Sequence, residues 1–254
     1  MKTSAVLRRC LLLLAVSSLA ASGIAQSQKH FLTVDELADS REILPEPPAE
    51  NSAQFAYDEA QYQWGKSIRD TPRGKMAVSD ADLSEGWIGR VFSEPFGYEI
   101  SAEKTPEIYK LLKGVERDAG SLSARKAKKH YMRKRPFMVH NELTSTPDQE
   151  EGMRTNGSYP SGHTARGWSL ALVLAELNPD RQEEILKRGF EYGQSRVIVG
   201  AHWQSDVDMG RIVSAAGVAR LHADDDFNSQ LLRAKAEVRA LKGETCGCGT
   251  SCCE

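Results

Sequence analysis

Apolar residues recur with the period of an α-helix along most of this chain. The pattern predicts amphipathic helices over residues 53–68, 80–92, 105–115, 121–131, 178–195, 207–223 and 226–241, and an apolar helix directly after residue 164. Alternation typical of a β-strand is scarce, and residues 197–199 form the one run that suggests it. We find no internal repeat. The sequence therefore predicts an all-α fold, a compact helical bundle.

Two proline-containing strings support this assignment because they mark helix starts. Thr105-Pro106-Glu107 and Asn178-Pro179-Asp180 each place a capping residue before a proline, which is favoured at the first helical position. Two of the expected helices also carry small residues that let helix backbones approach closely: Ala165, Gly167, Ala171 and Ala175 in one, and Gly210, Ala215, Ala216 and Ala219 in the other.

The first residues do not belong to the expected bundle. A basic start with Lys2, Arg8 and Arg9, an apolar run and a small-residue cleavage site predict a secretory signal peptide over residues 1–25, cut after Ala25. A retained membrane anchor is the weaker alternative, because serines interrupt an apolar run already short for a bilayer. Residues 26–51 are polar and contain several prolines, which predicts an arm before the helical domain over residues 52–242.

Composition and charge narrow the class of protein. The chain is 40% hydrophobic and 27% charged, which is ordinary for a soluble globular protein. Its formal charge of −2 becomes −5 once the signal peptide is removed, which argues against a nucleic-acid partner. No later stretch is long and apolar enough to span a bilayer. We therefore expect an exported protein, periplasmic or secreted, without stable membrane insertion.

The cysteines are concentrated in a tail over residues 243–254. One cysteine leaves with the signal peptide, and the other four are Cys246, Cys248, Cys252 and Cys253. Closely spaced thiolates suit a soft metal, and an oxidising compartment also allows disulfides within the tail or between chains. A flexible extension outside the domain is the simplest interpretation. The helical domain itself has no cysteine, so its stability cannot depend on disulfides.

Three short strings carry candidate chemistry, and the first is basic. Lys128 and Arg135 are seven residues apart, so on a continuous helix they would share a face, with Pro136 ending or kinking the helix there. An arginine can hold two phosphate oxygens at once, and a lysine adds a compact positive charge. The stretch 125–135 contains seven lysines and arginines, so a solvated basic face is the alternative.

The second string is Pro160-Ser161-Gly162-His163, within residues 156–164 and before an apolar helix. The N-terminus of a helix offers free N–H groups and the positive end of the helix dipole, which together favour an anion. Ser161 and Gly162 could hold its oxygens, and His163 could donate a proton to a leaving alkoxide. The alternative is a capped helix with a surface histidine.

The third string contains Arg196, His202 and Asp206. The histidine and the aspartate are four apart, on what we expect to be one helical turn, so Asp206 could fix the imidazole tautomer and leave a free lone pair. Such an imidazole can act as a nucleophile toward phosphorus, and Arg196 could bind the transferring oxygens. A buried structural histidine or a metal ligand is the alternative.

In this order and spacing the three strings resemble the superfamily that includes acid phosphatases, type 2 lipid phosphatases and vanadium haloperoxidases. Residues 157–164 are similar to the hallmark of bacterial class A non-specific acid phosphatases, and the resemblance covers residues 58–238. It implies a helical bundle of the acid phosphatase/vanadium haloperoxidase type, a homo-oligomer, and metal-independent hydrolysis of small phosphomonoesters without a cofactor. Nothing carries over to the cysteine tail.

The resemblance also implies a role for each residue. His202 would be the nucleophile that forms a phosphohistidine, Asp206 its orienting partner, and His163 the general acid and then the base that activates water. The phosphoryl oxygens would bind to five residues: Lys128, Arg135, Ser161, Gly162 and Arg196. No metal is expected in the active site.

Three other functions compete with this interpretation. A lipid phosphatase usually carries several membrane-spanning helices, and a vanadate-dependent haloperoxidase is usually a longer chain. A phosphate- or metal-binding protein without turnover would not need two histidines and an orienting aspartate.

Overall fold

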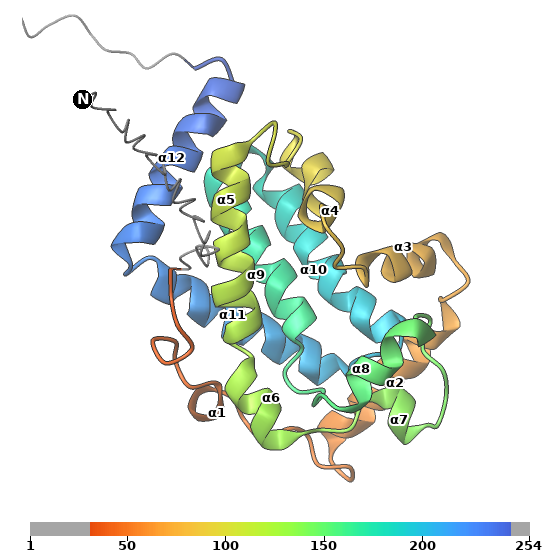
Figure 1. The fold of residues 1–254 in the computed structure, drawn as a ribbon. Helices are drawn as coiled ribbons and strands as arrows, with labels where there is room; N and C mark the ends of the chain where they lie inside the picture. Colours follow the sequence, from red (N-terminus) through yellow and green to blue (C-terminus); the bar gives the residue numbers. More distant parts are fainter. Residues whose placement is uncertain (1–30, 245–254) are drawn as a thin grey trace, which may run out of the picture.

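Every regular element within residues 31–244, the part of the chain that the computed structural model describes, is a helix (Figure 1). The all-α prediction is confirmed. The expected signal peptide and the four tail cysteines lie outside the described residues. The helices are α1 (Ser40–Ile43), α2 (Ala53–Ser67), α3 (Pro72–Asp80), α4 (Trp87–Phe96), α5 (Pro106–Val115), the π-helical η1 (Glu116–Leu122), α6 (Arg125–Tyr131), α7 (Pro136–Val139), α8 (Glu150–Arg154), α9 (Gly162–Leu177), α10 (Gln182–Ile198), α11 (Gln204–Leu221) and α12 (Asp225–Leu241), with 3₁₀ turns at Pro147–Gln149 and Pro179–Arg181.

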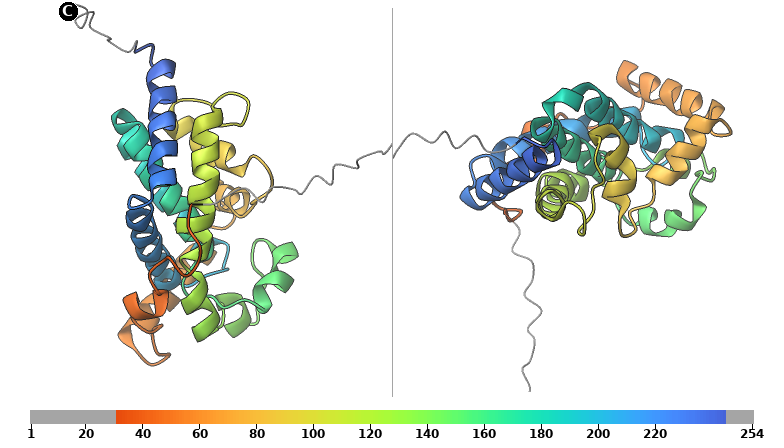
Figure 2. Two further views of the ribbon diagram at one scale, coloured as in Figure 1. Left: turned by 60° about the vertical axis from the view of Figure 1, so that its left-hand side comes forward. Right: turned by 90° about the horizontal axis from the view of Figure 1, so that it is seen from above.

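Helix α9 lies at the centre of the bundle, packed against α10, α11 and the α5–η1 segment (Figure 1). Its residues Leu170, Ala171, Val173 and Leu174 are fully buried, as expected for a helix that is apolar on all sides. Small residues on α9 allow close approach: a Cβ at Gly167 would lie 2.1 Å from the Tyr192 ring. Figure 2 shows α12 lying alongside α5 on the outside of this core.

The helix expected over residues 80–92 is wrong, because the chain breaks there into two helices. Helix α3 ends at Asp80 and α4 begins at Trp87. Between them the Asp82 carboxylate accepts hydrogen bonds from the Ser84 N–H and hydroxyl, both at 2.8 Å, and Gly86 adopts φ 79°. Local side-chain hydrogen bonds of this kind compete with helix formation. The carbonyls of Val78 and Ser79 accept N–H groups of the following residues, whereas the break leaves the Asp80 carbonyl without a backbone partner among the described residues.

The continuous helix expected to carry Lys128 and Arg135 on one face is also wrong. Helix α6 ends at Tyr131, and Met132 reverses the chain with φ 44°. Arg135 is the N-cap residue of α7, and Pro136 starts that helix rather than ending the previous one. The one strand-like run, residues 197–199, is not a strand, because Val197 and Ile198 form the last turn of α10.

The described part of the proline-containing arm, residues 31–51, packs against the bundle. Leu32 and Leu37 join the main core, and Leu44 joins a second cluster beside α6. The Leu32 N–H donates to the buried Asp118 carboxylate at 2.9 Å. This segment is therefore not a free linker, although its composition is polar. None of the helices in residues 31–244 has the length and hydrophobicity needed to cross a bilayer.

Candidate active site

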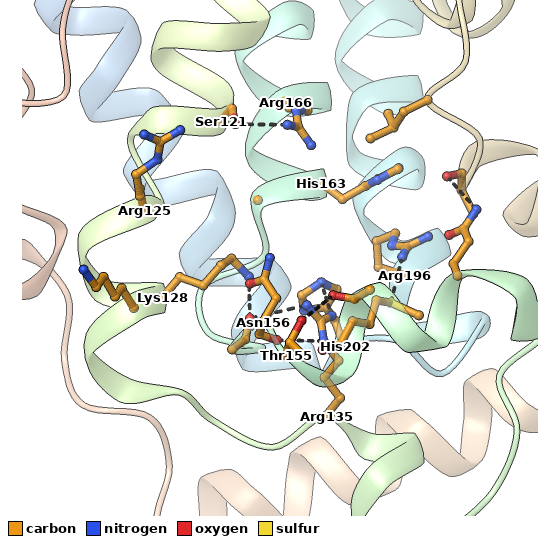
Figure 3. A pocket seen from close by; sticks show the side chains of 18 of the residues that line it. Ser121, Arg125, Lys128, Arg135, Thr155, Asn156, His163, Arg166, Arg196 and His202 are labelled. Carbon is orange, nitrogen blue, oxygen red and sulfur yellow. Dashed lines mark hydrogen bonds between the residues drawn. The ribbon is translucent and has the colours of Figure 1, made fainter.

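A cavity of about 730 Å³ opens between α6, the α7–α8 segment, the N-terminus of α9 and the end of α10 (Figure 3). Six of the predicted site residues line it: Lys128, Arg135, Gly162, His163, Arg196 and His202. The other two, Ser161 and Asp206, are fully buried. The three sequence strings therefore meet in one place, although two of them do so on different elements from those expected.

The lining of this cavity is strongly cationic. Among the described residues that line it are six lysines and arginines and no carboxylate: Arg125, Lys128, Lys129, Arg135, Arg166 and Arg196. Arg135 and Arg196 are buried and form no ion pair with the described residues, and buried cations that lack a counter-charge repel one another and lose hydration. An anion is the partner that such a cavity lacks.

His202 lies in the short loop between α10 and α11, not in a helix as expected. Gly200 turns the chain with φ 84°, and the Arg196 carbonyl accepts the His202 N–H at 3.2 Å. Helix α11 starts only after Trp203, whose N–H donates to the Asp206 carboxylate at 2.8 Å. Asp206 thus caps the helix with the same side chain that approaches His202.

The hydrogen bonds of His202 fix its tautomer. Arg135 Nη1 lies 2.9 Å from His202 Nε2, and because a guanidinium can only donate, Nε2 must carry the lone pair. The proton is then on Nδ1, which faces the Ser158 hydroxyl at 3.2 Å and Asp206 Oδ2 at 3.4 Å. Burial and then the charge of Arg135 hold the pKa of His202 well below its usual range. The imidazole is therefore neutral, as a nucleophile requires.

Behind His202 the Asp206 carboxylate is held by a buried network that sequence reasoning missed. Ser158 donates its hydroxyl proton to Asp206 Oδ2, and Arg133 Nη1 donates to Oδ1 at 2.8 Å. The same guanidinium binds the fully buried Asp58 at 2.8 Å. Ser158 lies inside the Gly-Ser-Tyr-Pro string and could have been noticed there. Asp58 gives no such signal, because helix packing alone brings it to the site.

His163 is held from the side opposite to His202. Its Nε2 lies 2.7 Å from the Asp80 carbonyl, which can only accept, so Nε2 carries a proton and Nδ1 remains for proton transfer. The ring stacks on Tyr192 with centroids 4.7 Å apart. Burial, and then the charge of Arg196, keeps the pKa of His163 well below its usual range. The carbonyl is available because α3 ends at Asp80. A helix continuing over residues 80–92, as the sequence predicted, would have used it in a backbone hydrogen bond.

Of the three cations beside the two histidines, Lys128 and Arg135 are held by backbone carbonyls, whereas Arg196 has almost no hydrogen-bond partners. Lys128 Nζ donates to the Gly157 carbonyl at 2.7 Å, and Arg135 donates to the Met153 and Ala201 carbonyls at 3.0 Å each. Arg196 has only a long contact of 3.8 Å to the Met153 sulfur, and its buried Nε and Nη1 have no hydrogen-bond partner among the described residues. Burial lowers the pKa of Arg135 and of Arg196 to about 10.

Ser161 completes this set as the N-cap residue of α9. Its Oγ accepts hydrogen bonds from the Thr164 N–H at 3.2 Å and from the Thr164 hydroxyl at 3.0 Å. Both bonds use oxygen lone pairs, which leaves the Ser161 hydroxyl proton to donate. The first N–H groups of α9, beginning with Gly162, have no acceptor within the helix.

Comparison with known proteins agrees with this arrangement. Residues 119–228 match the family model described as the PAP2 superfamily. The chain is 49% identical over 213 residues to a non-specific acid phosphatase of Providencia stuartii, covering 84% of this chain and 86% of the relative. A non-specific acid phosphatase of Salmonella typhimurium is 44% identical, with 84% and 86% covered, and an acid phosphatase of Zymomonas mobilis is 34% identical, with 89% and 88% covered. The chain belongs to the PAP2 superfamily and, within it, to the acid phosphatases.

Proposed function

We propose that this protein is an exported phosphatase that hydrolyses a broad range of phosphomonoesters through a phosphohistidine, without a metal. The observation that carries this is the pairing of a neutral His202, whose Nε2 lone pair faces the cavity cations, with His163 held separately by the Asp80 carbonyl. A lining of cations without a carboxylate suits a phosphate group and opposes a divalent cation. The predicted signal peptide supports a periplasmic or secreted location, and the family resemblance supports a homo-oligomer.

In the first step, the phosphoryl group binds among Lys128, Arg135, Ser161, Gly162 and Arg196. Arg135 moves its donor from His202 Nε2 to a phosphoryl oxygen and so releases the lone pair. That lone pair forms the N–P bond as the ester P–O bond breaks. The departing oxygen takes the proton from Nδ1 of His163, whose protonated form is favoured by the negative charge of the bound phosphoryl group.

In the second step, His163 acts as a base. It takes a proton from a water molecule as the water oxygen attacks phosphorus, and the N–P bond breaks. Inorganic phosphate and a neutral His202 result. Throughout, Asp206 and Ser158 hold the Nδ1 proton, which keeps the reacting nitrogen the same in every cycle.

The test is the hydrolysis of para-nitrophenyl phosphate by the mature protein with and without a chelator, beside His202→Ala and His163→Ala. We expect chelator-resistant turnover that His202→Ala abolishes while its circular dichroism stays unchanged. His163→Ala should release nitrophenol in one burst and retain one phosphoryl group, seen by mass spectrometry, because this good leaving group needs no acid but the water still needs a base.

Two results would contradict the proposal. Near-normal turnover by His202→Ala would rule out a phosphohistidine intermediate at this residue. If the chelator abolished activity and a divalent ion restored it, the mechanism would be metal-dependent.

A further inference from the structure

The cavity contains more cations than phosphoryl transfer requires. Figure 3 shows Arg166 next to His163 and Arg125 across the cavity from it, both away from His202 and Arg135. Lys128, Arg135 and Arg196 already supply three positive charges around a phosphate dianion. Arg125, Lys129 and Arg166 line the same cavity without a part in the proposed mechanism.

Arg166 is held in a fixed position at the cavity wall. It follows His163 by three residues on α9, so both side chains lie on one face of the helix. Its Nε lies 2.6 Å from Glu116 Oε1, and its Nη2 donates to the Ser121 hydroxyl at 3.0 Å. Its charge also contributes to the lowered pKa values of His163 and Lys128, whose larger cause is burial. Arg166 is thus ordered and close to the reacting groups.

Arg125 completes the group from the opposite wall. It is the first residue of α6, its side chain is exposed, and it makes no ion pair or hydrogen bond with the described residues. The next residue, Lys126, is different: it does not line the cavity and lies 3.9 Å from the Asp35 carboxylate. Glu116 balances the charge of Arg166, so the net positive charge at this end comes from Arg125.

The in-line geometry of the displacement determines which part of the substrate would contact Arg125 and Arg166. In an in-line displacement the leaving oxygen lies opposite the attacking nitrogen, so it points away from His202 and toward His163. The alcohol part of the ester then extends past His163 to the end of the cavity where Arg166 and Arg125 lie.

We propose that Arg125 and Arg166 form a second anion-binding site, which selects phosphomonoesters whose alcohol part carries a further carboxylate or phosphate. This inference rests on the proposed function, because it takes the orientation of the ester from the roles of His202 and His163. It adds a preference for phosphomonoesters that carry a second anionic group to an otherwise broad enzyme.

The test compares two substrates that differ by one carboxylate, phenyl phosphate and meta-carboxyphenyl phosphate. We expect the carboxylate to raise kcat/KM by roughly 2–5-fold in the wild type at low salt, as for a partly exposed charge pair. Arg125→Gln should reduce this ratio toward one. The matched control Lys126→Gln removes the same charge one residue away and should leave the ratio unchanged. Screening by salt should reduce the wild-type preference.

A variant that strengthens the preference separates this inference from simple damage to the cavity. Glu116→Gln removes the carboxylate beside Arg166 and leaves its charge unbalanced, so the ratio should rise above that of the wild type. An equal ratio in the wild type, Arg125→Gln and Glu116→Gln would overturn the inference.

Binding of non-hydrolysable phosphonates keeps this test independent of turnover. Phenylphosphonate and its meta-carboxy derivative, titrated by calorimetry, should show the same ratio in Kd as the esters show in kcat/KM. No hydrolysis of phenyl phosphate would refute the proposed function, whereas hydrolysis with no effect of the carboxylate on rate or Kd would refute the second site alone.

Discussion

The Ser158 hydroxyl lies closer to His202 than the Asp206 carboxylate does: Oγ is 3.2 Å from Nδ1, and Asp206 Oδ2 is 3.4 Å away. Because Ser158 gives its own proton to Asp206, its oxygen is free to accept the proton on Nδ1. Aspartate and histidine are therefore joined mainly through a serine.

We expect Ser158→Ala to lower kcat by roughly 10–100-fold with little change in KM, because a buried imidazole N–H loses its nearest acceptor at a cost of ~1–3 kcal/mol. Ser214→Ala is the matched control, since that buried hydroxyl bonds only within α11 to the Arg211 carbonyl. Steady-state kinetics of both variants are the measurement. Equal losses in the two would mean that Ser158 acts only through packing.

Arg133 should be critical for stability. It binds two fully buried carboxylates, Asp58 and Asp206, each at 2.8 Å. Replacing it with glutamine leaves two buried negative charges without a cation, and breaking such a pair costs ~3–5 kcal/mol. Chemical denaturation should show this loss. The control is Lys66→Gln, whose ion pair with Glu142 is exposed and should contribute little. A small effect at Arg133 would contradict a dry, ordered network.

The stability of the ligand-free protein should fall in acid. Burial lowers the pKa of His163 and of His202 below 6.5, so the unfolded chain binds these protons more readily than the folded protein. Each histidine makes its full contribution to the free energy of unfolding above pH 6.5. That contribution falls as the pH drops below 6.5, by up to ~1.4 kcal/mol per pH unit. Denaturation across this range should show the slope, and His163→Asn should reduce it. Phosphate should protect most at low pH, because its negative charge favours a protonated His163.

Two glycines next to the cavity should respond differently to alanine. At Gly157 a Cβ would lie 2.6 Å from the Lys128 carbonyl, so the loop must shift and the protein should lose stability. At Gly162 the nearest atom is Lys128 Cε at 3.7 Å, an ordinary contact. We expect Gly162→Ala to melt like the wild type but to bind substrate more weakly, because the methyl group enters the anion site. Thermal melts with KM values test both, and a normal Gly157→Ala variant would contradict the close approach.

The sequence predicted the helical class and most helices because these features depend on local apolar periodicity. Helix ends were less predictable. Met132 takes a left-handed conformation that its residue type does not signal, so the shared helix for Lys128 and Arg135 was wrong. His202 and Asp206 do come together, but through a loop and a helix cap.

The supporting residues of the site depend on contacts between distant parts of the chain. Asp58 and Asp80 reach the cavity region because α2 and α3 pack around it, and single-sequence patterns do not record packing. Arg125 belongs to the basic run at residues 125–135, which the sequence left open as a phosphate-binding group or a solvated basic face. The structure supports both, because Arg125 lines the cavity and Lys126 does not.

A cavity with cations and no carboxylate in its described lining also has a consequence for the end of each cycle. Inorganic phosphate has the same oxygens as the group that was transferred, so we expect it to remain bound by the same donors after the ester is gone. The rate of hydrolysis then falls as inorganic phosphate accumulates and rises again as its concentration drops. This feedback needs no second regulatory site and no moving part.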